Sequence, residues 1–154
     1  MQSLKYFTQE GNVYTKKPQT VFIITLALFL FLIVALILIK GAPTTSNKVI
    51  AGFVAFLGVI LFLRTSGKLR ISTGDRTLRY QPFFFSGEQV FSFDDFENFL
   101  ISKQSFLITM NATASIILYK NGKKKMIMLH QSVFVTKPLQ VVIEETSKIM
   151  GIPT

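Results

Sequence analysis

The most apolar part of the chain is Val21–Ile39, in which Thr25 is the only polar residue. A helix of that length rises ~28 Å, close to the ~30 Å hydrocarbon core of a bilayer. A buried core helix would need a soluble fold that surrounds it on all sides, and the rest of the chain is too short to form one. The pattern therefore predicts a transmembrane helix over about residues 19–40.

A second apolar run, Val49–Leu63, is shorter and would rise only ~22 Å as a helix. By length alone it could be a re-entrant or interfacial segment. Its polar residues lie only at the ends, however, so it has no polar face with which to lie on a membrane surface. With Ser46 or Asn47 as N-cap, we expect a second transmembrane helix over about residues 47–66.

The link between the two runs contains Gly41 and Pro43 and predicts a tight loop, so that residues 19–64 form an antiparallel helical hairpin. On the second helix, small residues recur at spacings of three and four, a pattern that lets another helix approach closely. This small-residue stripe could pack on the first helix or on a helix of a partner subunit. Its members are Ala51, Gly52, Ala55 and Gly58.

Lys and Arg residues near the ends of the two helices predict their orientation. The N-terminal tail, residues 1–18, and the stretch just after the second helix together hold eight of them, whereas the loop holds two. This difference predicts that both termini are cytoplasmic. We expect the first helix to stay attached as an anchor, because its apolar run exceeds that of a cleaved signal peptide.

Residues 67–154 predict a cytoplasmic domain of about seven short antiparallel strands, because apolar and polar residues alternate between closely spaced turn signals. Asn121-Gly122 is the strongest of these signals, since both positions tolerate the positive φ of a type I′ turn. The expected strands, joined as a meander, are 68–73, 77–81, 89–93, 96–102, 105–110, 113–120 and 123–130.

The spacing of apolar residues changes to a helical period near the C-terminus, from Leu139 to Met150. Thr136 is the expected cap of this helix, and Gly151 followed by Pro153 predicts its end. The predicted fold class is thus a membrane α-hairpin of two transmembrane helices plus a mainly-β domain with a C-terminal α-helix.

This order of elements resembles the bacterial PH-domain (pleckstrin-homology-like) membrane proteins that have an N-terminal transmembrane hairpin. The resemblance is one of architecture and covers nearly the whole chain. It implies a PH-like domain that acts as a scaffold or adaptor at the bacterial inner membrane, and it brings no catalytic residues. The segments that carry it are LRIST, RTLRYQPF, FSFDDFENFLIS, ILYKNGKKKMIML and the terminal helix.

The composition adds limits on the chemistry. An apolar share of 49% beside a net charge of +9 is common in small membrane proteins with basic flanks, so the charge needs no nucleic-acid partner. The absence of Cys excludes disulfides and thiolate zinc sites, and a single His excludes a multi-His metal site. We therefore expect no cofactor and no metal.

Two groups of basic residues in the domain are candidates for contact with anionic lipid headgroups. The first, the basic tip, surrounds the Asn-Gly turn and could equally be a solvated turn. The second, the basic hairpin, follows the second helix directly. It resembles in place the phosphoinositide motif of eukaryotic PH domains, but its spacing differs. The basic tip comprises Lys120, Lys123, Lys124 and Lys125, and the basic hairpin comprises Arg70, Arg76 and Arg79.

Catalytic patterns are missing from the sequence. Asp94 and Asp95 are neighbours in an expected turn, and no nucleophile elbow, phosphate loop or calcium loop is present. His130 is expected to be structural or exposed. We therefore do not expect an enzyme.

Three consecutive aromatic residues, Phe83, Phe84 and Phe85, follow Pro82, which ends a strand. Three large apolar side chains in a row cannot all face one core. At least one should meet lipid, another subunit or the helix, and we predict a partner contact here.

The leading hypothesis is a non-catalytic accessory or scaffold subunit of a larger inner-membrane protein complex, which presents the PH-like domain at the cytoplasmic face. Its partners would be other membrane protein subunits. The alternative is peripheral recognition of anionic lipid headgroups by the basic tip.

Overall fold

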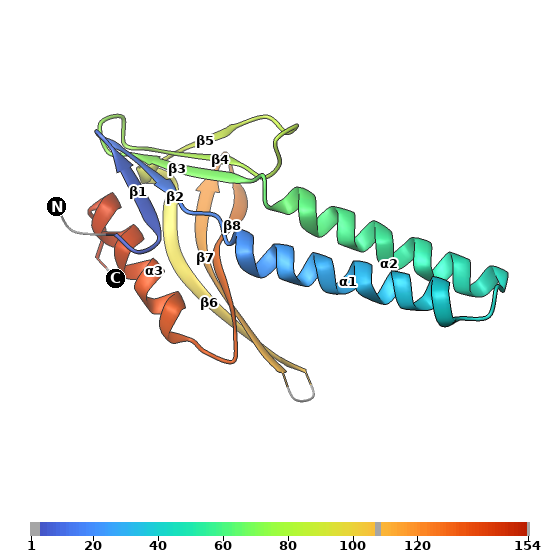
Figure 1. Cartoon of the computed structure of the whole chain (residues 1–154). Helices are drawn as coiled ribbons and strands as arrows, with labels where there is room; N and C mark the ends of the chain where they lie inside the picture. Colours follow the sequence, from blue (N-terminus) through green and yellow to red (C-terminus); the bar gives the residue numbers. More distant parts are fainter. Residues whose placement is uncertain (1–3, 107–108, 154) are drawn as a thin grey trace. The chain divides into compact units, whose positions relative to one another are not determined.

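The computed structural model describes residues 4–106 and 109–153, which form two compact units. One unit is a helical hairpin together with residues 81–87. The other is a β-rich domain that combines residues 4–17 with residues 68–80 and 88–153. In the sequence, the helical hairpin therefore lies between two segments that both belong to the β-rich domain, as the colours of Figure 1 show.

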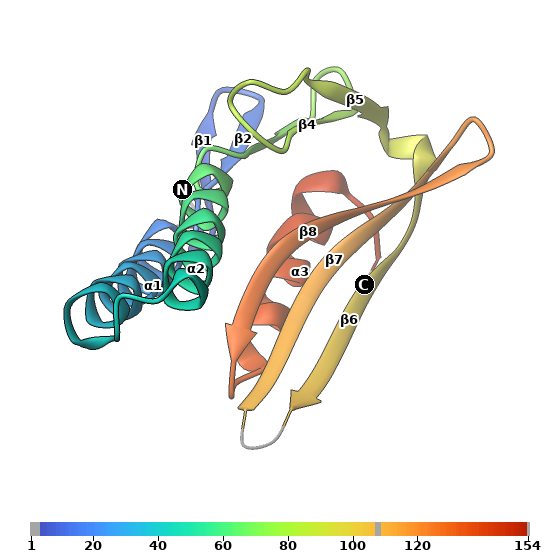
Figure 2. The ribbon, with the colours of Figure 1, turned by 90° about the vertical axis from the view of Figure 1, so that its right-hand side faces the viewer.

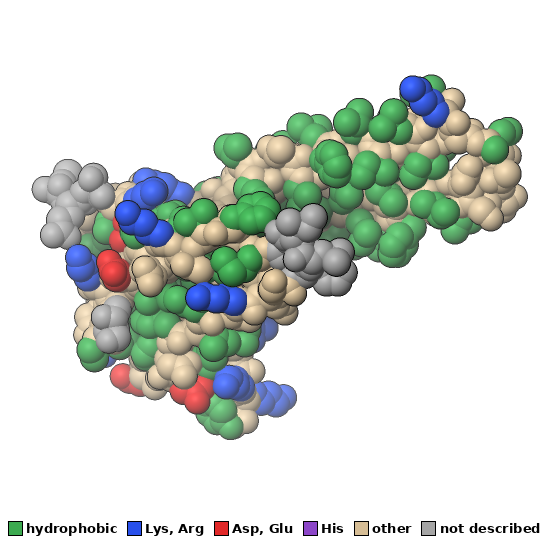
Figure 3. Space-filling view, turned by 90° about the horizontal axis from the view of Figure 1, so that it is seen from below, with side chains coloured by type: hydrophobic (Ala, Val, Ile, Leu, Met, Phe, Trp, Pro, Cys, Tyr) green, Lys and Arg blue, Asp and Glu red, His purple; other side chains and the backbone are tan. Residues whose placement is uncertain are grey.

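The helical hairpin consists of α1 (Thr20–Lys40) and α2 (Thr45–Arg64), which lie side by side in both ribbon views (Figures 1 and 2). By length and composition, both helices could cross a membrane. Only 6% and 11% of their most apolar windows are buried, which differs from the core helix of a soluble protein. Hydrophobic side chains cover the face of the hairpin seen in Figure 3.

The ends of α2 differ slightly from the prediction. Its N-cap is Thr44, not Ser46 or Asn47, and the Thr44 hydroxyl accepts a hydrogen bond of 3.3 Å from the Asn47 backbone N–H. At the other end the helix stops at Arg64, and the hydroxyls of the next two residues donate to carbonyls of the last turn. The helix thus covers residues 45–64 instead of 47–66.

The β-rich domain contains a five-stranded sheet and a three-stranded sheet. Strands in the first sheet are ordered as they occur in the chain, and the second sheet continues the meander after a short 3-10 turn, η1 (Phe93–Asp95). The first sheet comprises β1 (Phe7–Glu10), β2 (Val13–Lys16), β3 (Lys68–Ser72), β4 (Thr77–Gln81) and β5 (Gln89–Ser92). The second comprises β6 (Phe96–Phe106), β7 (Thr109–Lys120) and β8 (Lys123–Val133).

The prediction of about seven strands, all after the helices, was wrong in count and place for the described residues. Two strands precede α1, within the segment expected to be a tail, and β2 pairs antiparallel with β3. A second difference concerns the expected strands 96–102, 105–110 and 113–120. β6 continues past residue 102 to Phe106, and β7 already begins at Thr109, so no separate strand covers 105–110. Residues 107 and 108 of that expected strand lie outside the described residues. The break was expected at Lys103 and Gln104, but neither is a typical turn residue, and the ladder with β7 continues through both.

The Asn121-Gly122 turn is confirmed, with φ values of 52° and 72° that match a type I′ turn. The terminal helix is α3 (Lys137–Met150), which packs on β7 and β8 (Figure 2). Its end is of the Schellman type, because Gly151 has a φ of 67° and the Ile152 N–H donates to the Ser147 carbonyl. Thr136 precedes the helix as predicted, but its side chain makes no capping hydrogen bond.

One hydrophobic core holds the β-rich domain together, built from both sheets and α3. Leu78 of the first sheet, Ile116 and Ile127 of the second, and Leu139 and Val142 of α3 are all fully buried. Phe7 of β1 is buried in the same core. The N-terminal strands are therefore an integral part of this domain.

Candidate functional site

The basic tip lies at the β7–β8 turn, and half of its lysines are already engaged within the domain. The Lys120 ammonium donates to the Val90 carbonyl at 2.6 Å and lies 5.5 Å from the centroid of the Phe91 ring. Lys124 forms an ion pair with Glu97 at 3.9 Å. Lys123 is exposed and Lys125 is half-buried, and neither makes an ion pair with any described residue.

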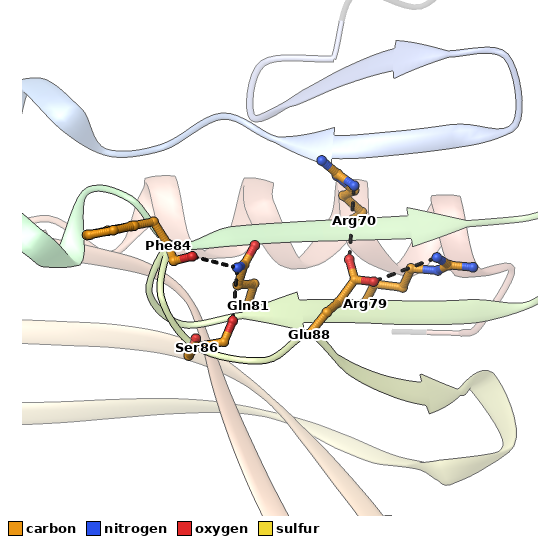
Figure 4. Close-up of polar contacts among 6 residues, drawn as sticks. All are labelled: Arg70, Arg79, Gln81, Phe84, Ser86 and Glu88. Carbon is orange, nitrogen blue, oxygen red and sulfur yellow. Dashed lines mark hydrogen bonds and ion pairs between the residues drawn. The ribbon is translucent and has the colours of Figure 1, made fainter.

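The basic hairpin is balanced by acidic residues of the same domain. Arg70 and Arg79 approach the two carboxylate oxygens of Glu88 at 4.0 and 3.7 Å (Figure 4). Arg76 lies 3.7 Å from Asp94 and 5.6 Å from the centroid of the Phe93 ring. These pairs are exposed and each is weak. They nevertheless leave the group with a much smaller net charge than three arginines would carry alone.

The acidic residues of η1 have local structural roles. The Asp95 carboxylate accepts from the Ser92 N–H at 2.9 Å while the Ser92 hydroxyl accepts from the Asp94 N–H, which forms a capping box. Throughout residues 4–106 and 109–153, no three His, Asp or Glu side chains are close enough together to hold a metal ion.

The small-residue stripe is divided between two environments. Ala51 and Gly58 are the buried residues of α2, as Ala27 is of α1. A Cβ at Gly58 would lie 3.1 Å from the ring of Phe31, so this glycine allows α1 and α2 to approach closely. Gly52 is exposed and a Cβ there would meet nothing within 4 Å, while Ala55 is half-buried.

The three aromatic residues form a compact structure that we call the aromatic turn, residues 83–86. The Phe83 and Phe85 rings stack with centroids 5.3 Å apart, and the Phe84 ring meets Phe85 edge-on at 5.2 Å. The side chains of Phe84 and Phe85 remain 66% and 65% exposed. This turn belongs to the same compact unit as α1 and α2.

Several hydrogen bonds stabilise the conformation of the aromatic turn. The Gln81 side-chain amide donates to the Phe84 and Ser86 carbonyls at 3.2 and 3.0 Å (Figure 4). The Ser86 hydroxyl accepts from the Phe83 N–H at 3.0 Å and donates to the Phe83 carbonyl at 2.8 Å. The Phe84 N–H donates to the Ser66 hydroxyl at 3.1 Å, which ties the turn to the chain just after α2.

A further cluster, around His130, could not be predicted because its members come from a segment that was expected to be a tail. The Tyr6 ring packs edge-on against the His130 imidazole, with centroids 4.8 Å apart. Burial, followed by the nearby positive charges of Lys16 and Lys5, lowers the pKa of His130 to about 4. Burial also lowers the pKa of Lys16 to about 8.

The N-terminal strands are fastened to this domain by α3 as well as by β3. The Glu145 carboxylate accepts from the Lys5 and Tyr6 backbone N–H groups at 2.7 and 2.9 Å. The Lys17 side chain donates to the Leu4 and Lys5 carbonyls. The sequence signal for these strands was Gly11-Asn12, a two-residue pair typical of a tight hairpin.

No protein-family model matches the chain, and no curated protein matches its sequence significantly.

Proposed function

We propose that the chain is a non-catalytic accessory subunit of a larger membrane protein complex. The hairpin of α1 and α2 spans the bacterial inner membrane and holds the β-rich domain at its cytoplasmic face. The observation that carries the proposal is the separation of the chain into two units: a domain with its own closed core and a hairpin whose apolar surface is exposed. Such a surface must be covered by lipid or by other apolar helices.

The pairing of β2 with β3 supports a complete hairpin in the membrane. These strands flank the two helices in sequence and are neighbours in one sheet, so they lie on the same side of any membrane. The helices between them must then cross an even number of times. A single crossing, with α2 re-entrant or lying on the surface, would be incompatible with this sheet.

A PH-like domain is part of the same proposal. Two antiparallel sheets followed by a C-terminal helix that packs on the second sheet support it. The N-terminal strand pair, which enlarges the first sheet to five strands, is the departure from the expected outline.

Recognition of anionic lipid headgroups by the basic tip and basic hairpin is the weaker alternative. Lys120 and Lys124 are engaged within the domain, and Arg70, Arg76 and Arg79 are close to carboxylates. Only Lys123 and Lys125 offer charges that no described acidic residue offsets. These two lysines, of which only Lys123 is fully exposed, would contribute at most about 2 kcal/mol at an anionic surface, which is not enough to select a lipid.

Purification of the tagged full chain in mild detergent tests the accessory-subunit proposal. We expect one or more membrane proteins to co-elute in a fixed ratio to the chain through a second sizing step. A similarly tagged two-helix membrane protein without this domain serves as the control. It identifies proteins that co-elute only because they share a detergent micelle. Elution of the chain alone, or with partners in no constant ratio, would contradict the proposal.

A further inference from the structure

We infer that the aromatic turn inserts into the lipid bilayer beside the end of α2, at the boundary between headgroups and acyl chains. The inference rests on the proposed function, because it requires α2 to span the membrane. It adds a third membrane contact to the two helices and assigns lipid, not a partner protein, as the occupant of the Phe84 and Phe85 surface.

The position of the aromatic turn is fixed by α2. The turn belongs to the same compact unit as the helical hairpin, so the end of α2 sets its depth. The hydrogen bond from Phe84 to Ser66 is made two residues after the helix ends at Arg64. A Cβ at Gly67 would lie 2.7 Å from the Pro82 carbonyl oxygen, so only glycine allows this close approach of the two chain segments.

In the aromatic turn, two phenylalanine rings that are 66% and 65% exposed form a surface with no polar side-chain atoms. The ring contacts with Phe83 hold them together as one cluster. Arg64 and Lys68 lie on either side of the Ser66–Gly67 link, where long cationic side chains reach lipid phosphates while apolar neighbours sit deeper.

Entry of a loop into an apolar boundary is costly unless its N–H and C=O groups are already hydrogen-bonded. In the aromatic turn, the side chains of Gln81, Ser86 and Ser66 supply these partners for the groups described above. The backbone N–H of Ser86 also donates to the Phe83 carbonyl at 3.0 Å. The backbone N–H and C=O groups of Phe83, Phe84 and Ser86 therefore already have partners before the turn meets lipid.

The chain contains no tryptophan, which makes each introduced tryptophan a unique fluorescent reporter. We would reconstitute the full-length Phe84→Trp variant into phosphatidylcholine vesicles whose acyl chains are brominated either near the headgroup or near the methyl end. Excitation that avoids the tyrosines reports only the quenching of the indole introduced at position 84. We expect at least twofold stronger quenching by the shallow bromines than by the deep ones. Phe85→Trp provides the same readout if the first variant does not fold.

Two reference variants separate this inference from the proposed function. Phe53→Trp lies on the exposed surface of α2 and should be quenched most by the deep bromines. Leu100→Trp, on the exposed side of β6, should not be quenched. Quenching at position 53 but not at 84 or 85 would overturn the inference and leave the membrane anchor intact. Absence of quenching at 53 would overturn the anchor itself.

The same reporter distinguishes lipid from protein as the occupant. If the emission of the Phe84→Trp variant is blue-shifted but insensitive to brominated lipid, the turn lies in a protein contact and the inference is overturned. Gly67→Ala in the Phe84→Trp background should reduce the shallow quenching, because the added methyl group forces Pro82 away from the end of α2. Unchanged quenching would show that the end of α2 does not set the depth.

Discussion

His130 is the chain's single histidine, and its surroundings make the stability of the fold depend on pH. The folded protein keeps the imidazole neutral down to about pH 4, since burial and the charges of Lys16 and Lys5 lower its pKa from 6.5. In the unfolded chain the same group binds a proton near pH 6.5. Between pH 6.5 and about pH 4, the unfolded state binds more protons than the folded state does. The free energy of unfolding therefore falls as the pH falls through this range.

We therefore predict that acidification from pH 7 to pH 5 lowers the free energy of unfolding through His130 by about 1 kcal/mol, after allowance for solvent screening. His130→Gln should remove this part of the pH dependence, and Lys16→Gln should reduce it, in thermal melts of the full chain in detergent. NMR titration of the single imidazole in the parent chain measures the pKa directly. A midpoint close to 6.5 would rule out the explanation.

Individual residues were predicted from sequence where the signal was local. Asn121-Gly122 and Gly151 both require positive φ in short, well-known motifs, and the structure has them there. The environment of His130 could not be foreseen in the same way, because it depends on Tyr6 and Lys16, more than 100 residues away in sequence. The hydrogen bonds that stabilise the aromatic turn could not be predicted either, because no sequence pattern marks Ser66 and Gln81 as its partners.

At the scale of the elements, the helices were predicted closely because each is a long, uniform apolar run with charged or breaking residues at its ends. The strands were predicted less well. β1 and β2 are four residues each, and so short an alternation next to a dominant apolar segment is also typical of a polar tail. The sheet that makes them stable is completed only by β3, which lies beyond both helices.

The small-residue stripe of α2 permits a test in which two glycines serve as each other's control. Gly58→Leu should push Phe31 away and weaken the hairpin by about 1–3 kcal/mol, because side chains in a packed interface cannot absorb the added volume. A Cβ at Gly52 would meet nothing within 4 Å, so Gly52→Leu should leave the stability of the hairpin unchanged. The SDS concentration at which the chain unfolds in mixed micelles measures both effects.

Gly52→Leu also tests whether a partner helix packs on the hairpin. If a partner subunit packs on the exposed part of the stripe, Gly52→Leu should reduce co-elution of that subunit while the hairpin keeps its resistance to SDS. An equal loss of SDS resistance in both variants would contradict the division of the stripe described above.

At the scale of the whole molecule, the five-stranded sheet limits the membrane topologies that the chain can adopt. β2 and β3 can pair only if both helices cross the membrane or neither does. The distribution of Lys and Arg then predicts the orientation of the hairpin in the membrane. The loop between the helices holds two basic residues and should face away from the cytoplasm. The eight basic residues before α1 and after α2 should face the cytoplasm. The absence of Cys makes this testable with single introduced thiols.

Three single-cysteine variants test this topology, with one exposed position before the helices, one between them and one after them. They are Thr8→Cys in β1, Ala42→Cys in the helical loop and Ser105→Cys in β6. We expect a membrane-impermeant maleimide to label only position 42 in intact spheroplasts, and all three positions after lysis; the parent chain stays unlabelled throughout. Labelling of 8 and 105 but not 42 would invert the orientation while preserving the sheet. Labelling of 8 and 105 from opposite sides would be the more serious result, because β2 and β3 could then not be neighbours in one sheet.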